Sequence, residues 1–520
     1  MRTRTSRALA AVLLLGLPLH AQQPAPPPGF DAYVAQVMST FQVPGLSVAI
    51  VKDGQVVLAR GYGVRQLGQP APVDARTGFG IASNSKVVTA TALALLVEEG
   101  KVEWDAPVVR YLPWFALSDP FVTRELTVRD LLVHRSGLGL GAGDLLWWPP
   151  STYTRREIAE RLRFIPLATS FRSAYAYDNV LYLIAGELIQ AVSGMSWEDF
   201  VRTRILEPVG MAHTAPRHSA AGAGANVATP HAPVNGTVRP VAPFISDNTN
   251  PAGGIVSGAE DMAKWVIVQL DSGKVAGGRL YSAASALQIW RDVTPTPIGP
   301  AIPGLEHLRP EFSGYALGLG VRDYRGLKLL QHTGGLPGYL SKVAMVPSRR
   351  LGVVVLTNQE SGFAFESIVY RVLDHYLAVT PVPDYVGLSA KLARQQEAEL
   401  ARLERETRAA RDSTSRPSLA LARYAGTYRD AWYGDVTLAL EGDRLVIRFT
   451  KSPSLVGDLE HWQHDSFAVR WRDRELRADA YITFALTHDG KVDQAKMVPV
   501  SPAVDFSFDW QDLVLRRVAP

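Results

Sequence analysis

Three short polar motifs, far apart along the chain, constrain what it can fold into. They are Ser83-Asn84-Ser85-Lys86, Tyr177-Asp178-Asn179 and His332-Thr333-Gly334. The first opens a helical run, the second precedes another apolar run, and the third follows a strand-like stretch. If the motifs act together, the fold has to bring a hydroxyl, an amine and a phenol from distant parts of the chain to one site.

The first motif pairs a nucleophile with a base. A serine hydroxyl is a poor nucleophile near neutral pH, so it needs a base and a site for the developing oxyanion. Ser83 and Lys86 are three residues apart, so their side chains share one face of a helical turn. The run Val87 to Glu99, closed by Gly100, predicts a helix whose N-terminal dipole favours an alkoxide at Ser83. We therefore expect Ser83 to attack while Lys86 helps to carry its proton.

The other two motifs add groups that an acyl-transfer site needs. A phenol such as Tyr177, held beside an ammonium, can have its pKa lowered enough to act as a base. Asn179 offers an amide to a substrate carbonyl. The third motif and Gly335 are expected along an edge strand, whose glycines let a substrate backbone come close. Singly, the motifs also fit a chance Ser-Lys pair, a core tyrosine and a turn histidine, but their conjunction favours one site.

With these motifs the chain resembles the penicillin-recognising serine hydrolases, specifically the class C β-lactamase and peptidase S12 group. The resemblance covers roughly residues 31 to 375. Sequence segments outside the motifs also match the family: Val43-Pro44-Gly45 leading into Leu46 to Tyr62, Leu131-Leu132-Val133-His134-Arg135-Ser136-Gly137-Leu138, and Pro251-Ala252-Gly253-Gly254.

The resemblance implies a role for each motif residue. Ser83 would be the acylated nucleophile, and Lys86 and Tyr177 would share the base and acid roles. Asn179 would orient the substrate. The remaining implied site residues are the catalytic His332, the substrate-binding Thr333 and Gly334, and the backbone amides of Ser83 and Gly335 as oxyanion hole.

One departure from the family bears on the substrate. Many β-lactamases carry lysine in the third motif, where this chain has His332, as some carboxypeptidases, D-amino-acid-specific peptidases and esterases of the group do. Because a histidine is only partly charged near neutrality, we expect it to hold a carboxylate less firmly than lysine would. A small peptide with a D-residue, or a carboxylic ester, is therefore expected ahead of a β-lactam.

The N-terminus has the pattern of an export signal. Arg2, Arg4 and Arg7 precede an apolar stretch from Ala8 to Leu19, and cleavage is expected after Ala21. The apolar run is too short to span a bilayer, so we expect a periplasmic or secreted protein without a transmembrane anchor after cleavage. An uncleaved anchor is the alternative.

Composition excludes several classes of function. Without cysteine the chain has no disulfide, thiolate nucleophile or thiol for lipid attachment. Removing the three leader arginines leaves 51 basic against 50 acidic side chains, so the net charge falls from +4 to +1 and indicates no nucleic-acid partner. The pair His461 and His464 has no H-E-x-x-H pattern around it, and we expect no metal and no organic cofactor.

The 520 residues, 47% of them hydrophobic, are expected to form more than one domain. After the signal peptide (1–21) and a proline-rich tether (22–29), residues 30–380 are expected to form an α+β catalytic domain. Its antiparallel sheet is flanked by helices and a mostly helical insert that carries Tyr177. The expected elements are a helix from Phe30 to Phe41, a hairpin of Leu46 to Ile50 with Gln55 to Arg60, and late strands Gly338 to Val346 and Leu351 to Thr357.

Two further segments follow. Residues 381–418 are expected to be a linker with a charged, solvated helix around Lys391 to Asp412; a coiled-coil contact, and so a homo-oligomer, is the alternative. Residues 419–520 read as an all-β module of hairpins that resembles a lipocalin-like barrel. We expect it to pack on the catalytic domain or mediate assembly rather than to bind a ligand alone.

The adjacent Trp147 and Trp148 lie in a proline-stiffened loop, Gly141 to Pro150. They either wall a substrate groove or pin the loop to the core, and the second reading is preferred. The sequence as a whole predicts a serine hydrolase acting on a small-molecule or short peptide substrate. The alternatives are a β-lactamase or D,D-carboxypeptidase, a silent protein that binds cell-wall fragments, and an acyltransferase.

Overall fold

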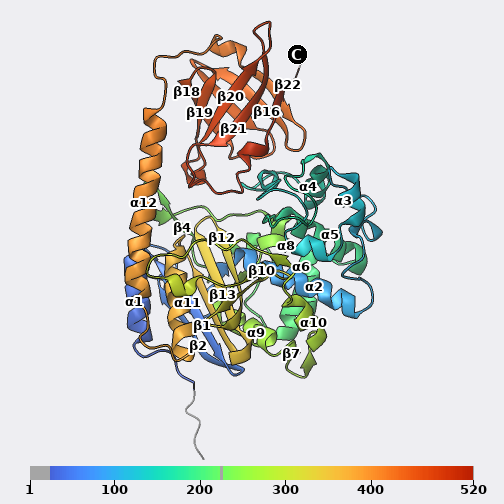
Figure 1. The fold of residues 1–520 in the computed structure, drawn as a ribbon, viewed down its shortest axis with the longest axis vertical. Coiled ribbons are helices and arrows are strands. Elements are labelled where there is room, and N and C mark those ends of the chain that lie inside the picture. The colour runs from blue at the N-terminus through green and yellow to red at the C-terminus, as the bar shows by residue number, and fades with distance from the viewer. Residues whose placement is uncertain (1–23, 223–225, 519–520) are drawn as a thin grey trace, which may run out of the picture.

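The computed structural model describes residues 24–222 and 226–518. The expected signal peptide, 1–21, lies outside the described residues. Figure 1 shows a larger α/β unit below and a small barrel above it, with one long helix running along the side between them.

An eight-stranded antiparallel sheet organises the larger unit, in the order β2-β1-β14-β13-β12-β11-β10-β9. Its strands are β1 Gly45–Lys52, β2 Gln55–Gly63, β9 Thr294–Pro295, β10 Ser313–Tyr315, β11 Gly320–Tyr324, β12 Leu327–Leu336, β13 Tyr339–Val346 and β14 Leu351–Thr357. The first hairpin and the late strands are confirmed. The pairing of β1 with β14 joins the two ends of this unit, as the strands at both ends of its sequence predicted.

Helices cover both faces of the sheet. Val48 and Ile50 of β1 point to the face covered by α1 (Phe30–Phe41) and α11 (Gly362–Tyr376), whereas Ala49 and Val51 belong to the core on the other face. Successive strand residues point to opposite faces, so a strand buried on both sides reads as a continuous apolar run. This packing explains why all seven residues of β14 are buried.

The helical insert lies between β2 and β9 and carries two of the three motifs. Its helices are α2 Lys86–Glu98, α3 Pro120–Glu125, α4 Arg155–Arg161, α5 Val180–Ser193, α6 Trp197–Val201, α7 Glu207–Val209, α8 Asn250–Gly253, α9 Ala259–Leu270 and α10 Ala283–Ile289. Its short paired strands are β3 Phe79–Gly80 with β6 Val256–Ser257, β4 His231–Val234 with β5 Thr237–Pro240, and β7 Lys274–Val275 with β8 Gly278–Arg279.

The helix predicted after the first motif is confirmed as α2. It is buried from Lys86 to Leu96, and Gly100 follows it with φ +69°. Among the described residues no single helix has the length and apolar content to cross a membrane; one bent pair, Val180–Ser193 with Trp197–Val209, meets the criterion by length and composition only.

The predicted charged helix is α12, Tyr385–Ala409. Its first turns pack on α11 and α1 through Tyr385, Val386 and Ser389, and most of its remaining length is exposed. In Figure 1 it passes from the α/β unit toward the barrel. The solvated connecting helix expected from the sequence is confirmed.

The C-terminal residues close into an eight-stranded barrel. Its strands are β15 Gly426–Asp430, β16 Gly434–Glu441, β17 Arg444–Phe449, β18 Val456–Gln463, β19 Ser466–Trp471, β20 Ala480–Leu486, β21 Val492–Pro499 and β22 Leu515–Arg517. Buried aromatic rings pack between them: Trp471 stacks on Trp510 at 5.4 Å between ring centres, and Phe449 contacts both. The all-β module of hairpins predicted for residues 419–520 is confirmed.

Candidate active site

The three motifs meet in one cleft of about 510 Å³. The cleft lies between β12, the helical insert and the loop that follows β21. Residues from all three motifs line it: Ser83, Tyr177, Asn179, His332, Thr333 and Gly335. The fold thus brings together residues that are separated by more than half of the α/β unit's sequence.

Ser83 and Lys86 are in direct contact. Ser83 belongs to a 3₁₀ turn, Ala82–Ser85, that leads into α2, and its Oγ lies 3.0 Å from Lys86 Nζ. Lys86 is completely buried, and its Nζ also contacts Asn179 Oδ1 at 2.7 Å and the carbonyl oxygen of Ala252 at 2.9 Å. These contacts occupy the three donors of an ammonium, and they fix the amine beside the hydroxyl.

Burial sets the protonation of the candidate base. It lowers the pKa of Lys86 to about 7, although the nearby carboxyls of Asp144 and Asp178 act in the opposite direction. Burial also raises the pKa of both carboxyls above their usual range. A buried ammonium loses hydration, so an appreciable fraction of Lys86 is uncharged near neutral pH.

The phenol of Tyr177 behaves differently from the prediction. Burial raises its pKa well above the usual value, and a side-chain hydrogen bond with Ser83 lowers it less than burial raises it. The expected lowering beside an ammonium is therefore wrong, although Lys86 Nζ does lie 4.9 Å from the centre of the ring. Tyr177 stays protonated near neutrality and is placed to donate a proton.

Asn179 holds the base in position. Its Oδ1 accepts from Lys86, and its Nδ2 donates to Asp144 Oδ2 at 2.7 Å. One N–H of the amide is left for other partners. Its contact with a substrate carbonyl stays a prediction.

Strand β12 presents the third motif, but it is not an edge strand as a whole. β11 pairs with its first half, up to Gln331, and β13 flanks it on the other side. From His332 to Leu336 the strand pairs with β13 alone, so this half offers a free edge to the cleft. The predicted edge is confirmed only for these residues, because β11 begins at Gly320 opposite Gln331.

The motif residue Gly334 and the adjacent Gly335 have different surroundings. A Cβ on Gly334 would lie 2.1 Å from the Ile81 carbonyl oxygen and 3.0 Å from Ala82 Cβ, so this glycine lets β12 pack on the turn that carries Ser83. Gly335 lines the cleft, and a Cβ there would meet only the end of the Leu340 side chain, at 3.3 Å. Ala82 itself has φ +48°, a conformation that side-chain-bearing residues adopt at a cost.

His332 is uncharged in this site. Burial lowers its pKa to about 3, and the Lys86 charge lowers it as well. Its Nε2 pairs with the hydroxyl of Tyr315 at 2.7 Å. The expectation of a partly charged histidine near neutrality is wrong, since the strand holds the ring away from water.

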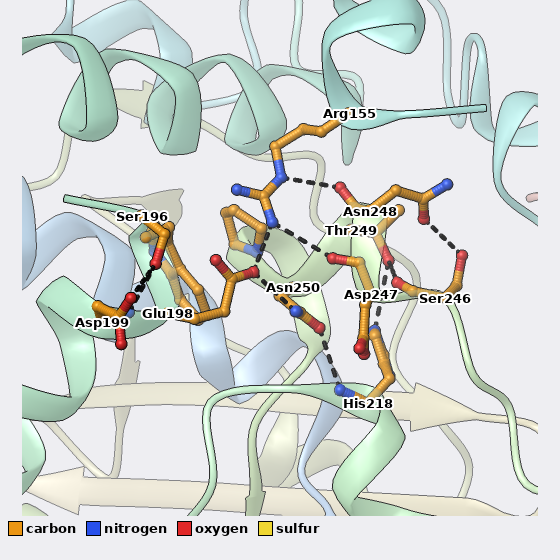
Figure 2. A network of polar contacts seen from close by, with 12 residues as sticks. Arg155, Ser196, Glu198, Asp199, His218, Ser246, Asp247, Asn248, Thr249 and Asn250 are labelled. Atoms are coloured by element: carbon orange, nitrogen blue, oxygen red, sulfur yellow. Dashed lines mark hydrogen bonds and ion pairs between the residues drawn. The ribbon is translucent and has the colours of Figure 1, made fainter. Parts of the chain in front are cut away.

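A polar network supports the segment that carries Ala252 (Figure 2). Arg155 donates to Glu198 at 2.6 Å, and Asn250 Nδ2 donates to the same carboxylate at 2.7 Å. Asn250 Oδ1 in turn accepts from the backbone N–H of His218 at 3.0 Å. The network fixes the start of α8, whose Ala252 carbonyl is a partner of Lys86.

Sequence reasoning missed the part of the site that comes from the C-terminal module. Phe506 lies edge-on to Tyr177 at 6.2 Å between ring centres, and the Ser507 hydroxyl donates to Asp144 Oδ2 at 2.9 Å. Both residues line the cleft. They follow the last long strand of the barrel in an irregular segment, so no periodic pattern marked them.

Three further groups in the site were not among the predicted site residues. They are Asp144, which lies in the tryptophan loop, Tyr315, which bonds to His332, and His134, whose ring lies 4.3 Å from that of Tyr177. Trp147 and Trp148 are about 5% and 6% exposed and pack on Phe244, as the preferred reading predicted, yet they also line the cleft. Among the described residues no group of three His, Asp or Glu side chains is placed to hold a metal ion.

Comparison with known proteins places the chain in a family. A family model described as Beta-lactamase matches residues 30–377, and one described as a domain of unknown function (DUF3471) matches residues 410–517. The chain therefore belongs to the beta-lactamase family, and the predicted resemblance and α+β fold are confirmed.

Two curated relatives and one solved structure illustrate the likeness. Unguisins hydrolase ungD of Aspergillus violaceofuscus is 29% identical over 444 residues, which are 79% of this chain and 76% of that protein. Penicillin-binding protein 4 of Amycolatopsis lactamdurans is 28% identical over 371 residues, 68% of this chain and 90% of that one. The octameric penicillin-binding protein homologue from Pyrococcus abyssi shares the fold, with a TM-score of 0.59, 22% identity, and coverage of 94% and 98%.

Proposed function

We propose that this protein is a serine hydrolase that forms an acyl-enzyme at Ser83 and releases the acyl group to water. Its substrates are amides, peptides, including ones with D-residues, or carboxylic esters. The contact that carries the proposal is the 3.0 Å pair of Ser83 Oγ and a buried Lys86 whose pKa is lowered to about 7. Such a pair activates a hydroxyl because the amine can accept its proton.

In the acylation step the neutral Lys86 takes the Ser83 proton while Oγ attacks the substrate carbonyl carbon. The oxyanion accepts hydrogen bonds from the backbone N–H groups of Ser83 and Gly335. When the tetrahedral intermediate collapses, the bond to the leaving group breaks and the leaving group takes the Tyr177 hydroxyl proton. Transfer of the new proton on Lys86 to the Tyr177 phenolate restores both groups.

Deacylation repeats these roles with water in place of Ser83. Lys86 accepts a proton from the attacking water, and Ser83 leaves the second intermediate with a proton from Tyr177. The same phenol therefore protonates both leaving groups, which agrees with its raised pKa. No cofactor takes part in either step.

The charge of the cleft favours an uncharged acyl substrate. His332 is neutral, Lys342 is paired with Glu366 at 2.9 Å, and the guanidinium of Arg322 donates to the carbonyl oxygens of Leu308 and Asp323. A substrate carboxylate would have to compete with Glu366 for Lys342, and with two carbonyl oxygens for the donors of Arg322. The name of the unguisins hydrolase supports a hydrolytic reaction here, and that of the penicillin-binding relative supports a β-lactam as the second candidate substrate.

The test combines labelling with substrate panels. A fluorophosphonate probe is expected to label the full-length protein and not Ser83→Ala. Turnover of p-nitrophenyl butyrate and of a panel of D-aminoacyl amides is expected to exceed that of nitrocefin. Strong turnover of nitrocefin alone would make the protein a β-lactamase, and absence of labelling of folded protein would favour a silent binding protein.

We also propose that the protein is exported, on the strength of the N-terminal leader pattern. Mass spectrometry of the protein recovered from the periplasm or medium is expected to find a mature chain that begins at Gln22. Recovery of the intact leader in the cell membrane would indicate the uncleaved anchor instead.

A further inference from the structure

A second cavity, of about 530 Å³, lies between the α/β unit and the barrel. It shares Trp148, Gly335, Leu336 and Asp505 with the cleft, so the two spaces adjoin at the end of the free edge of β12. Neither Ser83 nor Tyr177 lines it. The cavity is therefore an extension of the cleft that lies beyond the reacting groups.

The direction of the free edge indicates which part of a substrate would enter this cavity. The ring of Tyr177, the proposed proton donor to the leaving group, lies 6.2 Å from that of His332, at one end of the edge. The cavity adjoins the other end, at Gly335 and Leu336. With the carbonyl oxygen held at Gly335, the leaving group points toward His332 and the acyl substituent points toward Leu336.

Apolar side chains from three parts of the chain make up much of the cavity wall. Leu336 and Leu340 belong to the sheet, Phe244 to the insert, and Leu476 and Phe508 to the C-terminal module. Trp148 packs on both Phe244 and Phe508, at 4.7 Å and 6.5 Å between ring centres, and closes the side next to the cleft. Such a lining favours an apolar ligand.

The charged groups on the walls already have partners, and Asp473 and Asp505 accept from the backbone N–H groups of Glu475 and Ser507. Arg477 contacts both carboxylate oxygens of Glu360 at 2.6 Å, and Glu475 accepts from Arg239 at 2.8 Å. A charged ligand group would have to displace one of these pairs and lose its own hydration. The cavity is thus suited to an uncharged occupant.

We propose that the interdomain cavity binds the acyl substituent of the substrate and selects bulky, uncharged, apolar acyl groups. The inference rests on the proposed function, since it takes the direction of the substrate from Ser83, Gly335 and Tyr177. It gives the DUF3471 module a role in catalysis by the neighbouring domain: the module supplies part of the acyl pocket through Leu476, Ala503 and Phe508.

The test compares p-nitrophenyl acetate with p-nitrophenyl octanoate, which share a leaving group, on the full-length protein. We expect kcat/KM of the unmodified protein to be higher for the octanoate by roughly tenfold or more, as burial of several methylenes allows. Ala503 lines the cavity and is exposed, so Ala503→Trp fills the space without disturbing a core. This variant should lose the octanoate preference, measured as the ratio of kcat/KM for the octanoate to that for the acetate.

The matched control is Ala485→Trp, an exposed alanine on β20 that does not line the cavity, and it should keep the preference. Equal kcat/KM for the two esters, or an octanoate preference that survives Ala503→Trp, would overturn the acyl-pocket proposal and leave the hydrolase proposal intact. Absence of both turnover and fluorophosphonate labelling would overturn the proposed function and this inference with it.

Discussion

The surroundings of Lys86 decide which group in the cleft can act as the base. Its ammonium form has three hydrogen-bond acceptors, yet complete burial removes its hydration and lowers its pKa. The pKa of Tyr177 is shifted in the opposite direction, upward, because burial disfavours the phenolate. Two buried groups with opposite charges in their ionised forms are both driven toward neutrality, which supports the proposed roles of the amine as base and the phenol as acid.

This assignment predicts the pH dependence of the reaction. Protonation of Lys86 removes the base, so kcat/KM for p-nitrophenyl butyrate should fall about tenfold per pH unit below a pKa of about 7 and level off above it. Lys86→Arg keeps a cation at every pH, so we expect a loss of roughly 10²- to 10⁴-fold and no such acid limb. An acid limb near the same pH in Lys86→Arg would show that another group controls it.

The acid role of Tyr177 predicts a dependence on the leaving group. Tyr177→Phe should reduce kcat/KM for an amide by roughly 10²- to 10⁴-fold, because an amine leaves only with a proton. A p-nitrophenyl ester should lose much less, because p-nitrophenolate leaves without one. Steady-state kinetics with an ester and an anilide of the same acyl group make the comparison, and equal losses would assign Tyr177 to the base instead.

At the scale of single elements, the approach of β12 to the turn before α2 fixes the positions of the backbone amides proposed as oxyanion donors. Gly334→Ala would place a Cβ 2.1 Å from the Ile81 carbonyl oxygen, so we expect loss of most activity and about 1–3 kcal/mol of the free energy of unfolding. Gly335→Ala is the matched control, since its Cβ would meet a flexible leucine end. Urea unfolding of both variants checks the difference, and equal stability of the two would refute the close approach.

The elements that sequence patterns predicted are those whose signal is local. The helix Phe30–Phe41, the hairpin β1 with β2 and the two barrel hairpins each carry their own apolar period and turn residues. The short strands β9 to β11 have no comparable pattern, and their pairing decides which half of β12 is free. Strand β12, which was expected at the edge of the sheet, therefore has a free edge only along its second half.

The candidate site was predictable to the extent that its residues belong to motifs. The charge states of His332 and Tyr177 were predicted wrongly, because burial comes from segments distant in sequence. Phe506 and Ser507 gave no signal either, since their part in the site depends on how the barrel docks on the other domain. Docking surfaces are made by tertiary packing, which a single sequence pattern does not encode.

At the scale of the whole molecule, a chain of hydrogen bonds joins the barrel to Lys86, the proposed base. Ser507 donates to Asp144, Asn179 donates to the same carboxyl oxygen, and the Asn179 carbonyl accepts from Lys86. The backbone N–H of Gly143 donates to Asp509 at 2.8 Å and holds the tryptophan loop against the same segment of the barrel. The C-terminal module is thus coupled to the charge of the active site as well as to its shape.

This coupling predicts that a barrel residue tunes the base. The Ser507 hydroxyl lowers the pKa of Asp144, and ionised Asp144 raises that of Lys86. Ser507→Ala should therefore leave Asp144 less ionised, lower the pKa of Lys86, and move the acid limb of kcat/KM to lower pH by a fraction of a unit. The control is Ser501→Ala, whose hydroxyl accepts from the backbone of Ala503 and does not line the cleft. A limb that stays in place in Ser507→Ala, or that moves equally in Ser501→Ala, would show that the two domains share a wall but not an electrostatic connection.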